Sequence, residues 1–367
     1  MIARRVKSPA RARLLAWPAR FAGTRAVVWG DFVLDEYWRC RSSRVSREAP
    51  VLVLDYESRS VQGGGAANAA LTLAALGASV QAVGWIGGDE GGRELRRLLD
   101  RAGIDTAGLL AHPRGATVVK TRVVAGGSHT ARQQVVRVDR GARFGAGGGA
   151  ARRLLAALAR AMSDARAVVL SDYGYDSVTP ALVRAAFGRR RSRRVIVGLD
   201  ARYRLAEYRG VTLATPNESE AAHAAGREIR DERELAWAAA RLRRTLRATH
   251  LIITRGRDGL TLWNRRAVSL EAWGGEEAVD VTGAGDAVVA TATLALAVGA
   301  PALEAAALAN VAGSVAVSRR RLRPPRQPAH APGRAGVRRA ARVGGRHDRR
   351  GARRGPGARA RAGRGVA

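Results

Sequence analysis

The stretch Asp280-Val281-Thr282-Gly283-Ala284-Gly285-Asp286 leads directly into an apolar pattern of helical period over residues 284–298. Small residues at 283–285 let a ligand approach the backbone closely, and their amides would lie at the N-terminus of the helix. Unpaired amides and the helix dipole favour a bound anion there. Asp286 adds a carboxylate, and phosphoryl transfer needs both amides that stabilise the moving group and an acid that takes the hydroxyl proton. Taken alone, the pattern also fits an ordinary helix cap.

A second glycine-rich helix start, Gly63-Gly64-Gly65-Ala66-Ala67-Asn68, precedes a helix predicted over 66–76. Asn68 can hydrogen-bond a sugar hydroxyl. Gly30-Asp31 ends the first predicted strand and Asp35 follows one turn later, so carboxylates suited to polyol hydroxyls lie near a strand's carboxyl end. Ligands of open α/β sheets bind at such ends. Each feature is also explained by turn chemistry, which for Asp35 alone is the simpler interpretation.

Apolar runs of strand length alternate with longer helical patterns between about residues 25 and 318. Strands are predicted at 25–29, 80–86, 167–170, 195–199, 210–214 and 251–254, and helices at 66–76, 92–102, 180–187, 232–248, 284–298 and 301–317. This alternation predicts an α/β fold with a mainly parallel sheet covered by helices on both faces.

Three β-prone segments, at about 51–56, 117–124 and 133–139, interrupt the rhythm. They suit a small antiparallel sheet outside the main domain. A lid over an active site is the natural use of such a sheet, and an extension of the main sheet is the alternative.

Charge is unevenly distributed along the chain. The formal net charge is +33, but residues 319–367, with seventeen arginines and one acid, carry about half of it. Only Lys7 and Lys120 are lysines, and this near-exclusive use of arginine resembles the coding bias of a GC-rich genome. The tail also lacks the aromatic residues that stack on bases. We therefore expect no specific nucleic-acid partner, although binding through residues 319–367 is the alternative from another class.

Domain boundaries follow from the same composition. Residues 1–20 form a basic N-terminal tail, 21–318 one domain, and 319–367 an Arg-rich segment that cannot offset its ordering entropy and is expected to be disordered. The composition changes abruptly at the end of the last apolar element, so we hypothesise a reading-frame error or truncation near residue 319. An intact frame on resequencing, with a native peptide covering 330–367, would refute that hypothesis.

Cys40 is the only cysteine, which rules out an internal disulfide framework and a cysteine-based zinc site. The apolar stretch at 14–17 is too short for a signal-peptide core, and no run reaches the length of a membrane span. We expect a cytoplasmic protein without membrane contact.

Neither glycine motif is a Walker A loop, because neither lysine follows a glycine. The Gly-x-Gly-x-x-Gly fingerprint of dinucleotide-binding enzymes is missing from both as well.

The two glycine motifs, in this order and at this separation, resemble the signatures of the ribokinase-like (PfkB) carbohydrate kinase family. The resemblance covers about residues 25–318 and is strongest to the kinase half of bifunctional heptose 7-phosphate kinase/heptose 1-phosphate adenylyltransferases. The stretches that carry it are 30–38 (GDFVLDEYW), 43–50 (SRVSREAP), 133–139 (QQVVRVD) and 215–220 (TPNESE). It implies a three-layer sandwich with a small β-sheet lid, and a homodimer built through the lid strands.

The resemblance also implies roles for individual residues. Asp286 would be the general base and the amides of Gly283, Ala284 and Gly285 the anion hole, with ATP and Mg²⁺ as cofactors. The remaining assignments are: Asn217 and Glu220 for the magnesium ion through water; Asp31, Gly64, Gly65 and Asn68 for the sugar; Thr254, Gly256 and Gly259 for the nucleotide phosphates; and Asn310 for the adenine pocket. Whether a monovalent cation is required stays open.

Further candidates come from the residues themselves. Lys120, with Arg122 and Arg137 on the predicted lid strands, can pair with a substrate phosphate, although a solvated strand charge is the competing interpretation. Gln134 is a weaker sugar contact. Asp172 and Asp200 follow predicted strands and would face the cleft; Arg202 stands where many relatives carry Lys, which leaves the local role of Asp200 less defined.

These expectations converge on phosphorylation of D-glycero-D-manno-heptose 7-phosphate to the 1,7-bisphosphate. Another ribokinase-like sugar kinase, acting on fructose 1-phosphate, ribose or a ketodeoxy sugar acid, is the alternative, and so is a catalytically impaired product of a damaged gene. The sequence lacks the adenylyltransferase half with its His-x-Gly-His motif, and the family's C-terminal segment is replaced by the Arg-rich tail.

Overall fold

The computed structural model describes residues 2–126, 133–141, 143–145, 147–188, 195–274 and 283–322. They belong to one compact unit that ends at Leu322. Of the tail predicted to be disordered from residue 319, residues 319–322 belong to the last helix, and 323–367 lie outside the described residues. Asp280, Val281 and Thr282 of the first glycine motif also lie outside the described residues. The reading-frame hypothesis therefore stays a hypothesis.

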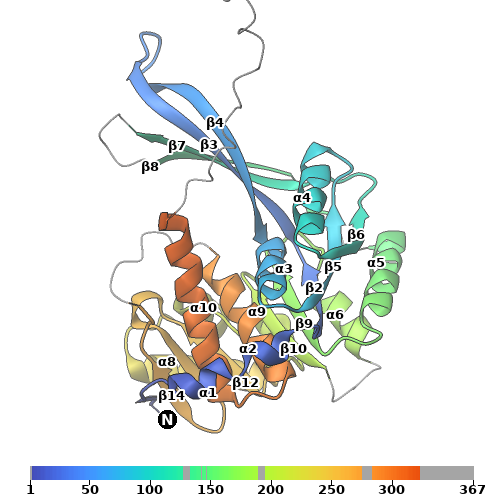
Figure 1. Ribbon diagram of the computed structural model, residues 1–367, viewed down its shortest axis with the longest axis vertical. Helices are drawn as coiled ribbons and strands as arrows, with labels where there is room; N and C mark the ends of the chain where they lie inside the picture. The colour runs from blue at the N-terminus through green and yellow to red at the C-terminus, as the bar shows by residue number, and fades with distance from the viewer. Residues whose placement is uncertain are drawn as a thin grey trace, which may run out of the picture. The chain divides into compact units, whose positions relative to one another are not determined.

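A ten-stranded sheet forms the centre of the unit (Figure 1). In spatial order its strands are β1 (Arg4–Arg5), β14 (Ala267–Leu270), β13 (Leu260–Trp263), β12 (His250–Thr254), β11 (Leu213–Ala214), β10 (Ile196–Ala201), β9 (Ala167–Asp172), β2 (Arg25–Gly30), β5 (Ser79–Ile86) and β6 (Asp105–Ala111). Only β13 runs antiparallel to its neighbours. The predicted mainly parallel sheet is confirmed, while β6, β13, β14 and β1 were not anticipated, and β11 is shorter than the strand predicted at 210–214.

Helices cover both faces of this sheet. One face carries α3 (Ala66–Ala75), α4 (Glu90–Arg101), α9 (Ala284–Ala297) and α10 (Ala302–Leu322); the other carries α5 (Gly148–Ala161), α6 (Pro180–Phe187), α7 (Glu218–Ala225) and α8 (Glu232–Leu246). Side chains of a strand alternate between faces, and in β2 Trp29 enters the core on one side while Val28 enters the core on the other. The three-layer sandwich is thus confirmed.

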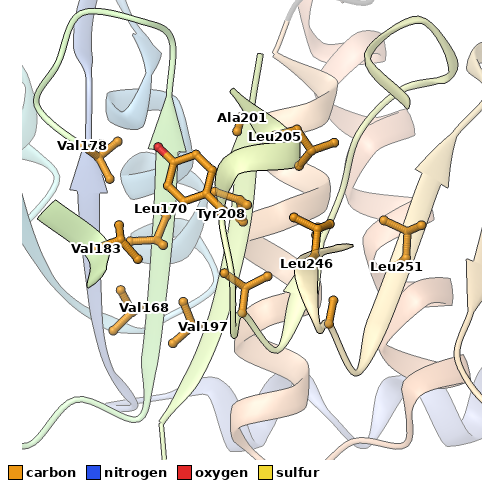
Figure 2. Close-up of a cluster of buried hydrophobic side chains, with 14 of the residues drawn as sticks. Val168, Leu170, Val178, Val183, Val197, Ala201, Leu205, Tyr208, Leu246 and Leu251 are labelled. Atoms are coloured by element: carbon orange, nitrogen blue, oxygen red, sulfur yellow. The ribbon is translucent and has the colours of Figure 1, made fainter. Parts of the chain in front are cut away.

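One of these cores lies between β9 and the helices on its face. Figure 2 shows Val168 and Leu170 of β9 near Val183 of α6, and Leu246 of α8 between Leu205 and Leu251. The ring of Tyr208 is fully buried in the same cluster, and its hydroxyl donates to Asp172 at the end of β9 (2.6 Å). The core therefore reaches up to the carboxyl end of the sheet and supports the residues there.

A second sheet of four strands projects from the first (Figure 1). Its order is β4 (Leu52–Gly65), β3 (Phe32–Val45), β7 (Val118–Gly126) and β8 (Gln133–Arg140). Three of these contain the predicted lid segments. The prediction was wrong in two respects: β3 was missed, since Asp35 was assigned to a turn, and β3 pairs with β7 in parallel, so the sheet is not wholly antiparallel.

The predicted N-terminal tail contains ordered elements. Strand β1 pairs with β14, and α1 (Arg11–Leu15) and α2 (Pro18–Phe21) follow it. Glu304, buried near the start of α10, accepts hydrogen bonds from Arg13 and from the indole of Trp17. Arg13 and Trp17 therefore brace α10, because a buried carboxylate requires partners.

At the other end, α10 continues four residues past the predicted boundary at 318. Within the described residues, no helix combines the length and the hydropathy needed to cross a membrane.

Candidate active site

A cavity of about 920 Å³ lies where the carboxyl ends of the central strands approach the smaller sheet. All but two of the site residues predicted from the sequence line it, and they come from both sheets and several helices. These residues are Asp35, Gly64, Gly65, Asn68, Lys120, Gln134, Arg137, Asp200, Asn217, Glu220, Thr254, Gly256, Gly259, Gly283, Ala284, Gly285, Asp286 and Asn310. Asp31 and Asp172 are not among the lining residues.

Helix α9 begins at this cavity. Gly283, which precedes its first turn, has a φ of 84°, a left-handed conformation that favours glycine. Gly285 is helical, and a Cβ added to it would meet no atom within 4 Å. The first amides of a helix have no acceptor within the helix. The chain therefore presents N–H groups with open space beside them, a geometry that suits an anion.

Asp286 lies in the first turn of α9 and is buried. Its Oδ1 accepts a hydrogen bond from the hydroxyl of Tyr173 (2.9 Å), and its Oδ2 accepts one from Nδ2 of Asn68 (3.0 Å). The same nitrogen donates to the carbonyl oxygen of Gly283 (3.0 Å), which joins the two glycine motifs. Since both amide protons of Asn68 are used, its Oδ1 is the atom left to interact with a sugar hydroxyl.

Asp31 shapes a loop instead of contacting the cavity. Its carboxylate accepts backbone hydrogen bonds from Tyr173, Tyr175 and Ser177, each at 2.9 Å. Burial raises the pKa of Asp31 to about 6, although these amides act in the opposite direction. Asp31 is buried and is not among the residues that line the cavity, because its carboxylate faces the loop that supplies these three amides.

Asp172 was also expected to face the cleft and does not. It is buried and pairs with the guanidinium of Arg204 (2.6 Å), besides accepting the hydroxyl of Tyr208. Arg204 also pairs with Asp176 (2.9 Å), one of the few non-glycine residues with positive φ. The network fixes the loop 173–178 that begins where β9 ends.

Asp35 is the carboxylate that reaches the cavity from this part of the chain. It lies on β3, and Nη1 of Arg122 donates to its Oδ1 (2.6 Å). A Cβ on Gly64 would lie 2.6 Å from Oδ2 of Asp35, so glycine is required for the close approach of the two strands. The structure thus presents Asp35 rather than Asp31 to a ligand.

Lys120 extends from β7 into the cavity. No ion pair of its ammonium group occurs within the described part of the chain; its Nζ lies 5.5 Å from the ring centre of Tyr173 and 5.8 Å from that of Tyr175. Burial, followed by the positive charge of Arg202, lowers its pKa. Arg137 lines the cavity nearby but pairs with Asp139 (2.8 Å). An anion bound beside Lys120 would relieve the repulsion among these cations.

Asn217 and Glu220 form a capping box at the start of α7. Oδ1 of Asn217 accepts from the amide of Glu220 (2.8 Å), and Oε2 of Glu220 accepts from the amide of Asn217 (2.9 Å). The pair therefore has a structural role whatever else it does, and one carboxylate oxygen of Glu220 is left for a ligand.

Asp200 and Glu220 offer oxygens of the kind that Mg²⁺ prefers, although within the described residues no three acidic, histidine or cysteine side chains are grouped to hold a metal ion directly. Burial raises the pKa of Glu220; burial, followed by the negative charge of Asp286, raises the pKa of Asp200 well above its usual value. The hydroxyl of Thr215 is buried at the cavity without a partner in the described residues. Such oxygen donors with excess negative charge suit Mg²⁺, which keeps several waters and binds few carboxylates directly. A divalent cation would favour the ionised form of both carboxylates, which burial disfavours.

The opposite end of the cavity is more apolar. Leu260, Val288 and Trp273 line it, the last with 54% of its surface exposed. Nδ2 of Asn310 on α10 donates to the carbonyl oxygen of Glu271 (2.6 Å), which anchors the segment that carries Trp273. This end therefore suits a flat, apolar group with a polar edge.

Two glycines beside it have left-handed conformations. Gly256 has φ 55° with open space around its Cβ position; Gly259 has φ 84°, and a Cβ there would overlap the carbonyl oxygen of Leu270. The turn after β12 therefore keeps its backbone close to the cavity.

The sequence reasoning missed Tyr173, Thr215 and Trp273 as lining residues. Tyr173 and Thr215 directly follow β9 and β11, so the strand-end rule that selected Asp200 would have found them. Trp273 lies in an irregular segment after β14, where no periodic signal marks it.

Comparison with known proteins agrees with this geometry. A profile of the pfkB family of carbohydrate kinases matches residues 24–329. Bifunctional protein HldE of Geobacter metallireducens is 41% identical over 297 residues, which cover 80% of this chain and 59% of that protein. The HldE of Caulobacter vibrioides is 41% identical over 307 residues, covering 82% of this chain and 62% of the relative. The chain spans about three fifths of the length of these relatives.

Solved structures share the fold at lower identity. Arabidopsis thaliana ribokinase, complexed with ribose and ATP, has a TM-score of 0.60 and 20% identity, covering 81% of this chain and 93% of that one. Escherichia coli phosphofructokinase-2, in complex with fructose-6-phosphate, has a TM-score of 0.65 and 20% identity, covering 81% and 94%. Both confirm the ribokinase-like architecture.

Proposed function

The chain belongs to the pfkB family of carbohydrate kinases, and from that premise we propose that it transfers the γ-phosphoryl group of ATP to a phosphorylated sugar. The proposed substrate is D-glycero-D-manno-heptose 7-phosphate and the product is its 1,7-bisphosphate. The anomeric hydroxyl oxygen bonds to the γ-phosphorus, the bond from that phosphorus to the β–γ bridging oxygen breaks, and ADP leaves.

Asp286 is the proposed general base. It lies beside the open amides of α9, so the hydroxyl proton can pass to its carboxylate while the amides of Gly283, Ala284 and Gly285 stabilise the charge on the transferring group. Asn68 and Tyr173 orient the carboxylate through one hydrogen bond each. Asp35 and the Oδ1 atom of Asn68 are placed to hold sugar hydroxyls.

The nucleotide is proposed to lie along the α9 and α10 side of the cavity. Leu260, Val288 and Trp273 would contact the adenine, and Gly256 would leave room for the phosphates. Asn217 and Glu220 would hold Mg²⁺ through water, with Asp200 nearby; the ion would neutralise phosphate charge when bound.

The observation that favours a phosphorylated sugar is Lys120. Its ammonium group lines the cavity, is half-buried, and has no ion pair in the described residues; burial and the charge of Arg202 lower its pKa. Such a site favours an anionic ligand group, for which the distal phosphate of the sugar is the candidate. Gln134 and Arg137 of β8 line the same region.

A cytoplasmic homodimer is part of the proposal. Strand β8 is an edge strand, and its Val135, Val136 and Val138 are 46–49% exposed. Exposed apolar edges favour association with a second copy. A monomeric mass in light scattering at micromolar concentration would contradict this.

The test is ADP release with Mg-ATP across heptose 7-phosphate, fructose 1-phosphate, ribose and a ketodeoxy sugar acid. We expect turnover on heptose 7-phosphate that falls about 10²–10⁴-fold in Asp286→Asn. Asp231→Asn is the matched control, because Asp231 also lies at a helix N-terminus but caps α8, outside the cavity. Turnover only on another sugar would refute the substrate; none on any sugar, from folded protein, would favour the damaged-gene alternative.

A further inference from the structure

Tyr173 lies between the two glycine motifs and the proposed base. Its hydroxyl donates to Oδ1 of Asp286 (2.9 Å), and a Cβ on Gly65 would lie 3.3 Å from its ring. Gly65 has a φ of 54°, which favours glycine, and a side chain at this position would also be crowded by the tyrosine ring. One residue therefore contacts both motifs.

We propose that Tyr173 is a positioning residue whose hydroxyl keeps Asp286 ionised and correctly oriented for proton transfer. This inference rests on the proposed function, in which Asp286 is the base.

The surrounding loop holds the tyrosine in place. Asp31 accepts the amide of Tyr173 at 2.9 Å, and Gly174, with φ 84°, donates its amide to Asp172 (2.9 Å). Arg204 ties Asp172 to Asp176 within the same loop. Asp31 and Asp172, expected to bind sugar, thus serve to fix the backbone from which Tyr173 reaches Asp286.

The charges around Asp286 include both signs. Asp200 at the end of β10 is the carboxylate that faces it, with Glu220 of α7 near Asp200. Arg202 after β10 and Lys120 of β7 supply positive charge, and both lie close to the ring of Tyr173. Like charge from Asp200 favours protonation of Asp286, and a hydrogen bond to the ionised form opposes it.

The surroundings of Tyr173 favour the protonated hydroxyl that donates this bond. Burial, followed by the negative charge of Asp286, raises the pKa of its hydroxyl well above the usual value. Removing the hydroxyl should raise the pKa of Asp286, because the hydrogen bond stabilises the ionised carboxylate more than the neutral carboxyl group.

The first test is the pH profile of kcat for Tyr173→Phe, which removes the oxygen and keeps the ring against Gly65. We expect the acid limb to move to higher pH by about one unit and kcat at its plateau to fall roughly tenfold, with KM for the sugar changing less than about threefold. Tyr175→Phe is the matched control: Tyr175 also donates its amide to Asp31, and its acid limb should stay at the wild-type position.

A second readout does not depend on activity. Titration of ¹³C-labelled aspartate carboxyls should show one carboxyl, absent in Asp286→Asn, whose pKa rises in Tyr173→Phe and not in Tyr175→Phe. Reciprocally, a titration followed by tyrosinate absorbance should show that one tyrosine of Asp286→Asn ionises at lower pH than it does in wild type. This measurement keeps the hydroxyl of Tyr173, so it tests the contact even if Tyr173→Phe does not fold.

The outcomes separate the two proposals. An inactive wild type with the expected carboxyl shift would overturn the proposed function and keep the contact between Tyr173 and Asp286. An active wild type in which Tyr173→Phe and Tyr175→Phe share one pH profile and one set of carboxyl titrations would overturn the role of Tyr173.

Discussion

Replacement of Gly285 by alanine should move stability and activity in opposite directions. Gly285 is in the first turn of α9 with helical backbone, and a Cβ there meets no atom within 4 Å. Alanine restricts the unfolded chain without straining the folded one, so the free energy of unfolding should rise by about 0.5–1 kcal/mol. For a unit of this size the melting temperature would rise by roughly 1–4 °C.

The same methyl group would enter the space that we assign to the transferring phosphoryl group. Removal of one donor from an oxyanion site costs about 10²–10³ in kcat, and displacement of a reacting group by about 1 Å costs a similar factor. Gly285→Ala should therefore lose about 100-fold or more in kcat while remaining folded.

The assay pairs thermal melting with ADP release, and the chain offers a matched control. Gly149 occupies the corresponding second position of α5, its Cβ would meet only the end of Arg152 at 3.9 Å, and it is outside the cavity. Gly149→Ala should gain similar stability and keep full activity. Full activity of Gly285→Ala would refute the assignment of the anion site to the amides of α9.

Three further changes test other parts of the molecule. Lys120→Met should raise KM for a phosphorylated sugar about 100-fold and leave KM for ATP unchanged, as measured from initial rates. Equal increases of KM for both substrates would contradict the assignment of Lys120 to the sugar phosphate. Burial raises the pKa of Asp31 in the folded state to about 6. Between pH 4 and 6 the folded state therefore binds more protons than the unfolded state, and this group should lower the free energy of unfolding by roughly 3 kcal/mol as the pH rises through that interval. Urea unfolding should show this dependence on pH in wild type and not in Asp31→Asn. Arg13→Ala removes a partner of buried Glu304 and should lower the free energy of unfolding by about 1–3 kcal/mol. Because α10 lines the cavity, the same variant should raise KM for ATP. Arg11→Ala on the same helix is the control, and equal effects of both variants would argue against the brace.

The regular elements were largely predictable because their signals are local. The helix over 180–187 and the buried strand at 167–170 are encoded by periodicity and by neighbouring turn residues, and both are present, the strand two residues longer than predicted. The strand Phe32–Val45 was missed because its outer half is solvated on the lid, so its residues there do not alternate cleanly between apolar and polar.

The sequence by itself determined the α/β fold, the family and the two glycine motifs, since each of these is encoded by residues close together along the chain. Only the tertiary structure decided which side chains meet. Asp31 and Asp35 look alike in the sequence. In the structure, three backbone amides of the loop 173–178 donate to Asp31, whereas Asp35 lines the cavity. The hydrogen bond between Tyr173 and Asp286 could not be inferred either, because the two residues are more than a hundred positions apart along the chain. A parallel sheet brings the ends of distant strands to one edge, and the burial and hydrogen bonds that assign each polar group its role exist only once those ends are assembled.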